Sequence, residues 1–187
     1  MAKALIFLAE GHEEVEMLTV VDLLRRAKIE IAMVSITGNK QVTSSHGVTL
    51  VADALIEEVD FDAADMLILP GGMPGTLNLK AHKQLGEQLC RFAQEGKWLA
   101  AVCAAPTVLG DLGILEGHKA TCFPGFVDKL VCGQYVKQPV VVDGKVITSR
   151  GMGTCIEFGL QIITALADAE TAEQVRTSII YQDQYDE

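Results

Sequence analysis

Cys103 is the residue best placed for covalent chemistry, because it joins a buried apolar run to the start of a helical pattern. The run Lys97–Val102 predicts a strand, and Ala104–Leu112 predicts a helix. Small residues beside the thiol allow the backbone to turn sharply, as in a nucleophile elbow, although the usual flanking glycines are absent. A helix N-terminus at this point would also favour the thiolate. Position alone does not separate this interpretation from a buried core cysteine.

Glu16 is the candidate proton carrier. It lies in the first turns of a predicted helix over Glu13–Ala27, directly after a predicted strand over Lys3–Leu8. Apolar residues flank it, and a carboxyl group beside a thiolate in partly dry surroundings has a raised pKa. Such a group can keep its proton and hydrogen-bond the sulfur, or move protons during a reaction. A solvated helix acid is the competing interpretation, and Glu13 and Glu14 are expected to complement the helix dipole.

Gly71 and Gly72 follow a predicted strand over Asp65–Leu69. Glycines at a strand end let backbone N–H groups approach a ligand closely, so the pair could form an oxyanion hole. An ordinary turn is the alternative, since Pro-Gly-Gly sequences often form turns. The Lys-Ser/Thr of a P-loop is missing and no GxGxxG follows the first strand, so a nucleotide cofactor is not expected.

Histidines are of interest because a cysteine nucleophile usually works with a base. His12 lies in the loop after the first strand and could reach the site, whereas His46 lies in a predicted hairpin. His82 and His118 have polar neighbours that are typical of the protein surface. None of the four directly follows Cys103.

The five cysteines are odd in number, scattered and without a CxxC pair: they are Cys90, Cys103, Cys122, Cys132 and Cys155. That spacing predicts neither a disulfide framework nor a zinc site, so no metal is expected. No secretory signal is visible, and the most apolar segment falls short of the ~20 residues that a membrane span needs. We expect a cytoplasmic protein with reduced thiols and no membrane contact.

Strand and helix patterns alternate along residues 1–187, which predicts one α/β domain with a mainly parallel sheet covered on both faces. The stretch Val42–Ala54 predicts a hairpin added at the sheet edge, and Asp143-Gly144 predicts the turn of a second hairpin. One long helix is predicted from about residue 78 to residue 95.

The carboxyl ends of parallel strands are where such sheets bind ligands. Four groups of residues follow predicted strands and are expected to converge there: Glu10 to Glu16 with His12, Gly71-Gly72, Cys103, and Ser149-Arg150-Gly151. A carboxylate, a glycine pair and a thiol at one sheet edge are the components of a nucleophilic site.

Composition narrows the class of protein further. The hydrophobic fraction of 49% excludes intrinsic disorder, and 187 residues can bury a sizeable core. The net charge of −10 argues against non-specific binding to nucleic acid or to an anionic membrane, which requires a basic face. The aromatic fraction of 5% indicates a core of Ala, Val, Leu and Ile, as in a parallel sheet covered by helices.

These residues together resemble the ThiJ/PfpI superfamily, and within it the branch of the Parkinsonism-associated deglycase and its bacterial YajL-like relatives. The resemblance covers nearly the whole chain and rests on five blocks that occur in the same order. They are Glu-Gly-His-Glu-Glu-Val-Glu (10–16), Val-Asp-Leu-Leu-Arg-Arg-Ala (21–27), Leu-Pro-Gly-Gly (69–72), Ala-Val-Cys-Ala-Ala-Pro-Thr (101–107) and Thr-Ser-Arg-Gly-Met-Gly-Thr (148–154).

The resemblance implies a flavodoxin-like three-layer sandwich that forms a homodimer and uses no cofactor. It implies that Cys103 is the nucleophile and that Glu16 is the carboxylic acid bonded to its sulfur. The backbone N–H groups of Gly72 and Ala104 would form the oxyanion hole, and Arg150 matches an arginine of the branch. Family activities include glutathione-independent glyoxalase, deglycation of early glyoxal or methylglyoxal adducts, peroxide sensing and chaperone action.

Three positions depart from the family pattern. The peptidase-like relatives have a histidine directly after the nucleophile, where this chain has Ala104. Some members of the deglycase branch place a histidine before the proline of the next loop, where this chain has Phe123 before Pro124. An arginine often found in the edge hairpin is replaced by His46. The first two departures disfavour a catalytic triad and leave a Cys–Glu pair, and the third argues against a second anion-binding group.

The leading hypothesis is therefore cysteine-dependent glyoxalase or deglycase chemistry on methylglyoxal or glyoxal, free or as early adducts, with a role in oxidative stress. A redox-sensing or chaperone-like protein that uses oxidation of Cys103 is the alternative from another class. A cysteine peptidase or amidotransferase is a third and less favoured hypothesis.

Overall fold

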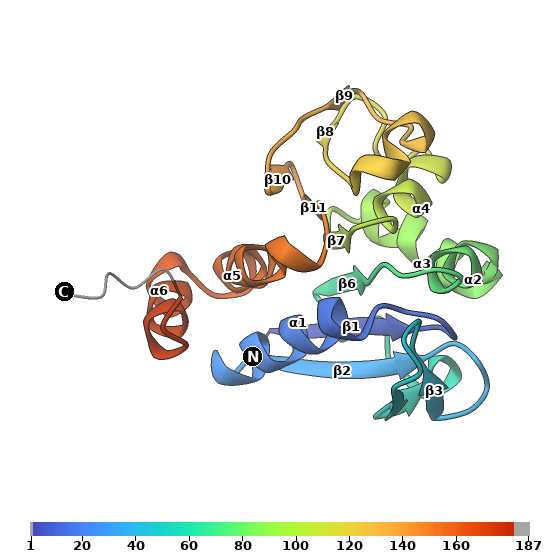
Figure 1. The fold of residues 1–187 in the computed structure, drawn as a ribbon, viewed down its shortest axis with the longest axis horizontal. Coiled ribbons are helices and arrows are strands. Elements are labelled where there is room, and N and C mark those ends of the chain that lie inside the picture. Colours follow the sequence, from blue (N-terminus) through green and yellow to red (C-terminus); the bar gives the residue numbers. More distant parts are fainter. Residues whose placement is uncertain (1, 182–187) are drawn as a thin grey trace.

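A seven-stranded sheet forms the centre of the molecule (Figure 1). The computed structural model describes residues 2–181. All neighbouring strands of this sheet run parallel, with the exception of one antiparallel hairpin at an edge of the sheet. In spatial order the strands are β10 (Val140–Asp143), β11 (Val146–Ser149), β7 (Trp98–Val102), β6 (Met66–Leu69), β1 (Lys3–Leu8), β2 (Glu30–Ser35) and β5 (Ala54–Leu55).

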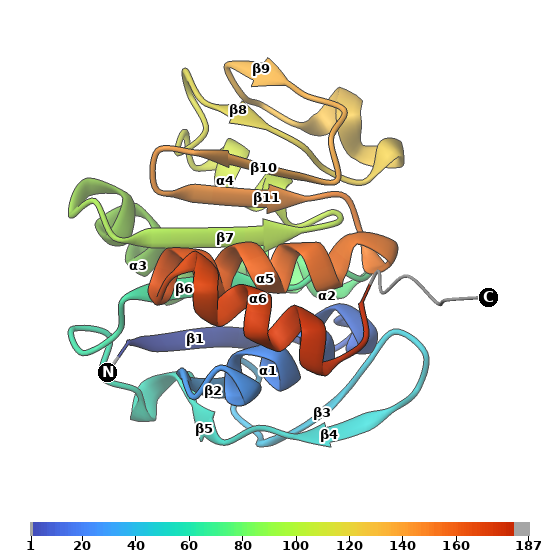
Figure 2. The same cartoon turned by 90° about the vertical axis from the view of Figure 1, so that its left-hand side faces the viewer.

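Helices cover both faces of the sheet, and Figure 2 shows one of the two helical layers in front of it. This layer contains α1 (Glu14–Arg26), α5 (Cys155–Leu166) and α6 (Ala169–Ser178), and the other contains α2 (Gly75–Ala81), α3 (Lys83–Gln94) and α4 (Pro106–Asp111). Successive side chains of a strand point to opposite faces. In β1, Ile6 and Leu8 therefore pack into the core beneath α1 and α5, whereas Leu5 and Phe7 pack into the other core. The predicted mainly parallel α/β architecture is confirmed.

The single long helix predicted from residue 78 to residue 95 is wrong. The chain forms α2 and α3 instead, and His82 between them has an extended backbone with φ −82° and ψ 104°. The Nδ1 atom of His82 accepts a hydrogen bond from the N–H of Leu85 at 3.2 Å. This side chain therefore caps the start of α3, a local interaction that hydrophobic periodicity does not reveal.

The hairpin predicted at Val42–Ala54 forms, but it is not part of the main sheet. Its strands β3 (Gln41–Thr43) and β4 (Thr49–Val51) make a separate antiparallel pair, and β5 takes the sheet edge. A second small sheet pairs β8 (Lys119–Ala120) with β9 (Gln134–Tyr135). Short 3₁₀ helices complete the described fold: η1 (Ile56–Glu58), η2 (Pro124–Lys129) and η3 (Met152–Thr154).

The carboxyl ends of β1, β6, β7 and β11 lie side by side because these four strands are parallel neighbours. Backbone hydrogen bonds join the loops that follow them. The N–H of Cys103 donates to Ser149 O at 3.0 Å, and the N–H of Glu13 donates to Gly71 O at 2.9 Å. The sheet therefore brings the predicted site residues together at the carboxyl ends of its strands, as the order of strands and loops in the sequence indicates.

Candidate active site

Cys103 occupies a sharp turn immediately after β7. Its backbone has φ +62°, a left-handed conformation that is uncommon for residues other than glycine. The turn is held on both sides, because the Cys103 N–H donates to Ser149 O and the Cys103 carbonyl accepts from Phe123 N–H at 2.8 Å. A strained backbone conformation of this kind persists only where the surrounding structure fixes it, and such conformations are typical of functional sites. The geometry is that of the predicted elbow.

Glu16 lies in the first turn of α1 and is 1% exposed. Its Oε2 atom accepts a hydrogen bond from Gly71 N–H at 2.8 Å, and its carboxyl group also hydrogen-bonds to the Cys103 thiol and to the Met152 N–H. Burial disfavours the charged carboxylate and outweighs these hydrogen bonds, so it raises the pKa of Glu16 to about 7. The raised pKa expected from its apolar neighbours is confirmed.

Cys103 and Glu16 compete for one negative charge. Burial, followed by the charge of the Glu16 carboxylate, raises the pKa of the Cys103 thiol to about 12. Two backbone N–H groups act in the opposite direction, because those of Ala104 and Gly72 hydrogen-bond to the sulfur. Near neutral pH the thiol is protonated and the carboxyl group is partly ionised, so the pair carries at most one negative charge. Moving one proton from the sulfur to the carboxylate produces a thiolate beside a neutral acid.

The helix predicted from Ala104 begins two residues later, as α4. This helix has six residues and begins at Pro106, three positions after Cys103. The donors nearest the sulfur are the N–H groups of Ala104 and Gly72. These are the two groups that the family resemblance implies for an oxyanion hole, and both approach the sulfur.

Gly71 and Gly72 are required by close packing around the pair. A methyl group on Gly71 would lie 2.6 Å from both the Cβ of Cys103 and the Oε2 of Glu16, well inside contact distance. Gly72 has φ +91°, and a methyl group there would lie 2.4 Å from the backbone nitrogen of Glu13. The glycine pair is thus more than an ordinary turn, because its lack of side chains lets three loops meet.

His12 is fully buried but is not placed as a base for Cys103 in the described structure. Its Nδ1–H donates to Ala9 O at 2.9 Å, and its Nε2 has no hydrogen-bond partner within residues 2–181. Burial lowers the pKa of His12, so the ring is neutral near neutral pH. Its recorded contacts fix the loop between β1 and α1, since its carbonyl also accepts from Ser45 N–H.

Arg150 follows β11 and contributes to a cavity of about 360 Å³ next to the pair. Its backbone N–H donates to Pro139 O, and its Nε is buried without a partner among the described residues. Phe123 and Met152 also line this cavity. Sequence reasoning did not assign a role to Met152, whose backbone N–H reaches Glu16, although the glycine-flanked Gly-Met-Gly sequence was a signal for an exposed backbone.

Glu13, Glu14 and His46 form a cluster at the start of α1. One ligand atom from each lies within 4.8 Å of the other two, so the cluster has atoms that could bind a cation. The structure accounts for all three in another way. Glu13 accepts from the Glu16 N–H at 2.6 Å as the N-cap of α1, and Glu14 pairs with His46 Nδ1 at 3.1 Å, which raises the pKa of His46.

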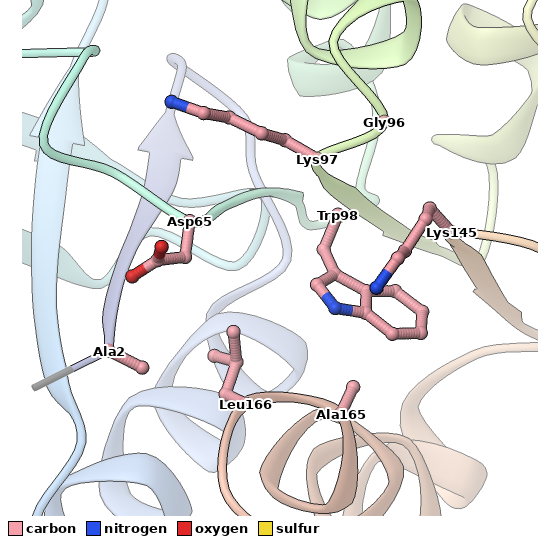
Figure 3. A pocket seen from close by; sticks show the side chains of 8 residues that line it. All are labelled: Ala2, Asp65, Gly96, Lys97, Trp98, Lys145, Ala165 and Leu166. Atoms are coloured by element: carbon pink, nitrogen blue, oxygen red, sulfur yellow. The ribbon is translucent and has the colours of Figure 1, made fainter.

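A larger cavity of about 510 Å³ lies at the opposite ends of the strands, where they begin (Figure 3). Trp98 and Lys145 point toward each other there, and the Lys145 ammonium lies 4.4 Å from the indole centre. Its lining includes neither a thiol nor a glutamate. The groups suited to nucleophilic chemistry therefore lie at the carboxyl ends of the strands.

Comparison with known proteins identifies the class. Residues 2–165 match the model of the DJ-1/PfpI family. The solved structure of Toxoplasma gondii DJ-1 in an oxidized form is 34% identical, with a TM-score of 0.94 over 98% of this chain and 100% of that chain. The chain belongs to the DJ-1/PfpI family, with its mostly parallel central sheet and flanking helices.

Two curated relatives add detail on length and activity. The chain is 37% identical to Protein DJ-1 homolog B of Arabidopsis thaliana over 95% of its own length, but it spans only 41% of that relative. It is 34% identical to the Caenorhabditis elegans protein named glutathione-independent glyoxalase DJR-1.2, over 89% of this chain and 90% of that one. The resemblance stated from the sequence is confirmed at the level of the family.

The raised pKa of Glu16 predicts a pH-dependent stability. Between an unfolded pKa near 4.5 and a folded pKa of about 7, the folded chain keeps a proton that the unfolded chain releases. This contribution to the free energy of unfolding is complete below pH 4.5 and disappears as the pH rises through 7. Relative to Glu16→Gln, the wild type should lose about 3 kcal/mol over this interval in urea unfolding experiments.

Glu57→Gln is the matched control, because Glu57 is an exposed glutamate remote from the thiol. Its stability should follow that of the wild type at every pH. Parallel pH profiles for the wild type and Glu16→Gln would contradict the raised pKa.

Proposed function

We propose that the protein is a cofactor-independent glyoxalase and deglycase that acts on methylglyoxal, glyoxal and their early adducts. The observation that carries this proposal is the buried Glu16 carboxyl group bonded to the thiol of Cys103, with the N–H groups of Gly72 and Ala104 beside it. A relative that is 34% identical is named a glutathione-independent glyoxalase, which supports the same chemistry here.

The first step is addition. Glu16 takes the proton of the Cys103 thiol, and the thiolate forms a C–S bond to the aldehyde carbon of the 2-oxoaldehyde. The carbonyl oxygen becomes an oxyanion that the N–H groups of Gly72 and Ala104 stabilise, and it then takes the proton from Glu16 to give a hemithioacetal.

The second step moves hydrogen between two carbons. The Glu16 carboxylate removes the proton from the carbon bonded to sulfur and returns it to the neighbouring carbon, so that a thioester of a 2-hydroxy acid results. Water then cleaves the C–S bond, releases the acid and restores the thiol. The sum is 2-oxoaldehyde plus water to 2-hydroxy acid, and no external oxidant or reductant is needed.

A peptidase or amidotransferase mechanism has less support. Ala104 stands where the peptidase-like relatives have histidine, and the described structure records no hydrogen bond between a histidine and the thiol. The acid–base group available to Cys103 is Glu16.

The proposed mechanism predicts that purified protein converts methylglyoxal to lactate without glutathione. Cys103→Ala removes the nucleophile and Glu16→Gln removes the proton carrier, so each should lower the rate of lactate formation at least ~100-fold. Cys90→Ala is the matched control, because Cys90 is a half-buried thiol on α3, and it should keep the wild-type rate. Full lactate production by Cys103→Ala would refute the mechanism.

A redox-sensing role is a second candidate, supported by the exposure of the thiols. Cys103 is partly accessible, whereas Cys122 and Cys155 are buried. A matched structure of a relative is described as oxidized. Susceptibility to peroxide follows thiolate character and access, and both are available at Cys103 once Glu16 holds the proton.

Mild peroxide should therefore convert Cys103 to the sulfinic acid before the other partly accessible thiols, Cys90 and Cys132. Peptide mass spectrometry measures the order of oxidation. Selective oxidation in a protein that turns over no dicarbonyl would favour the sensor, whereas equal oxidation of the three thiols would exclude it.

No helix within residues 2–181 is long and apolar enough to cross a membrane. The cytoplasmic location expected from the cysteine spacing stays a prediction, as do the homodimer and the chaperone activity that the resemblance implies.

A further inference from the structure

The cavity beside the active site has an apolar wall. The rings of Phe123 and Pro124 and the thioether of Met152 line it together with the turn at residues 150–154, around a volume of about 360 Å³. Phe123 is 46% exposed and Met152 is 57% exposed, so both offer carbon surface to a molecule that enters. Neither side chain is needed for the chemistry of the Cys103–Glu16 pair.

Two residues of the cavity lining are hydrogen-bonded to the reacting residues through their backbone N–H groups. Phe123 N–H holds the carbonyl of Cys103, and Met152 N–H hydrogen-bonds to the carboxyl group of Glu16. A methyl group on Gly151 would lie 3.4 Å from the Phe123 ring and 3.8 Å from Oε1 of Glu16. A substrate bonded to the sulfur therefore has this wall within reach of its substituent.

The residue at position 123 determines the polarity of the wall. The Phe123 side chain has no hydrogen-bond donor or acceptor, so a polar substituent placed against it would lose its water without gaining a partner. Arg150 is the charged residue of the lining, and its Nε atom is buried.

We propose that this cavity makes the enzyme selective for 2-oxoaldehydes with an aryl or bulky alkyl substituent, in preference to methylglyoxal and glyoxal. The inference rests on the proposed glyoxalase function and names the substrate class of the same site. The reaction is unchanged: thiolate adds to the aldehyde, hydrogen moves to the neighbouring carbon, and water releases the acid, so phenylglyoxal plus water gives mandelate.

The test compares kcat/KM for phenylglyoxal and for methylglyoxal in wild type and Phe123→His, from initial rates without glutathione. The ratio of the two values within each protein is the quantity of interest, because dividing one protein's ratio by the other's cancels the intrinsic reactivity of the aldehydes. We expect the ratio to fall about 10-fold or more in Phe123→His, mainly through the KM for phenylglyoxal.

Phe126→His is the matched control. Phe126 lies three residues further along, in η2, and does not line the cavity, so its replacement should leave the ratio unchanged. Met152→Gln changes another residue of the same lining and should lower the ratio as Phe123→His does.

The outcomes separate the two claims. Turnover of both aldehydes with the same ratio in wild type and Phe123→His would overturn the selectivity while leaving the proposed function intact. Absence of both lactate and mandelate in the wild type would overturn the proposed function and the selectivity with it.

Discussion

The burial of one carboxyl group against one thiol is the constraint on which the site depends. Glu16 and Cys103 cannot both be charged in these surroundings, since each charge would have to be kept out of water beside the other. Sharing one charge resolves the conflict. It also supplies what nucleophilic catalysis requires, a group that takes the thiol proton and can return it within hydrogen-bond distance.

The rest of the fold keeps these two groups together. The elbow at Cys103 is held by hydrogen bonds from two loops, and α1 begins where its first turn aims Glu16 at the same point. Glu13 fixes that beginning as the N-cap. The glycines at 71 and 72 leave no side chain in the space where the loops meet, so a methyl group there would force the pair apart.

The sequence predicts much of this arrangement because hydrophobic runs and strand-end residues are local signals. It places β1, β6 and β7, the elbow and the loop of Glu16 correctly, and their parallel order brings them together. It does not reveal the break at His82, which depends on one side chain capping the next helix. It also places the hairpin of β3 and β4 on the main sheet, because strand propensity does not say which strands pair.

The electrostatics of the site are harder to predict from the sequence than the positions of its residues. The sulfur accepts hydrogen bonds from two backbone N–H groups, those of Ala104 and Gly72, that only the folded chain brings together. The sequence does indicate the raised pKa of Glu16 from its apolar neighbours. The balance between burial and the hydrogen bonds from Gly71 and Met152 requires the assembled site.

The most direct measurement of the central claim is infrared difference spectroscopy of the Glu16 carboxyl group, wild type minus Glu16→Gln, below and above neutral pH. A shared proton predicts the C=O band of a protonated, buried carboxylic acid on the acidic side of pH 7, and a shift of that band in Cys103→Ala. A carboxylate band alone throughout the acidic range, unaffected by Cys103→Ala, would contradict the account.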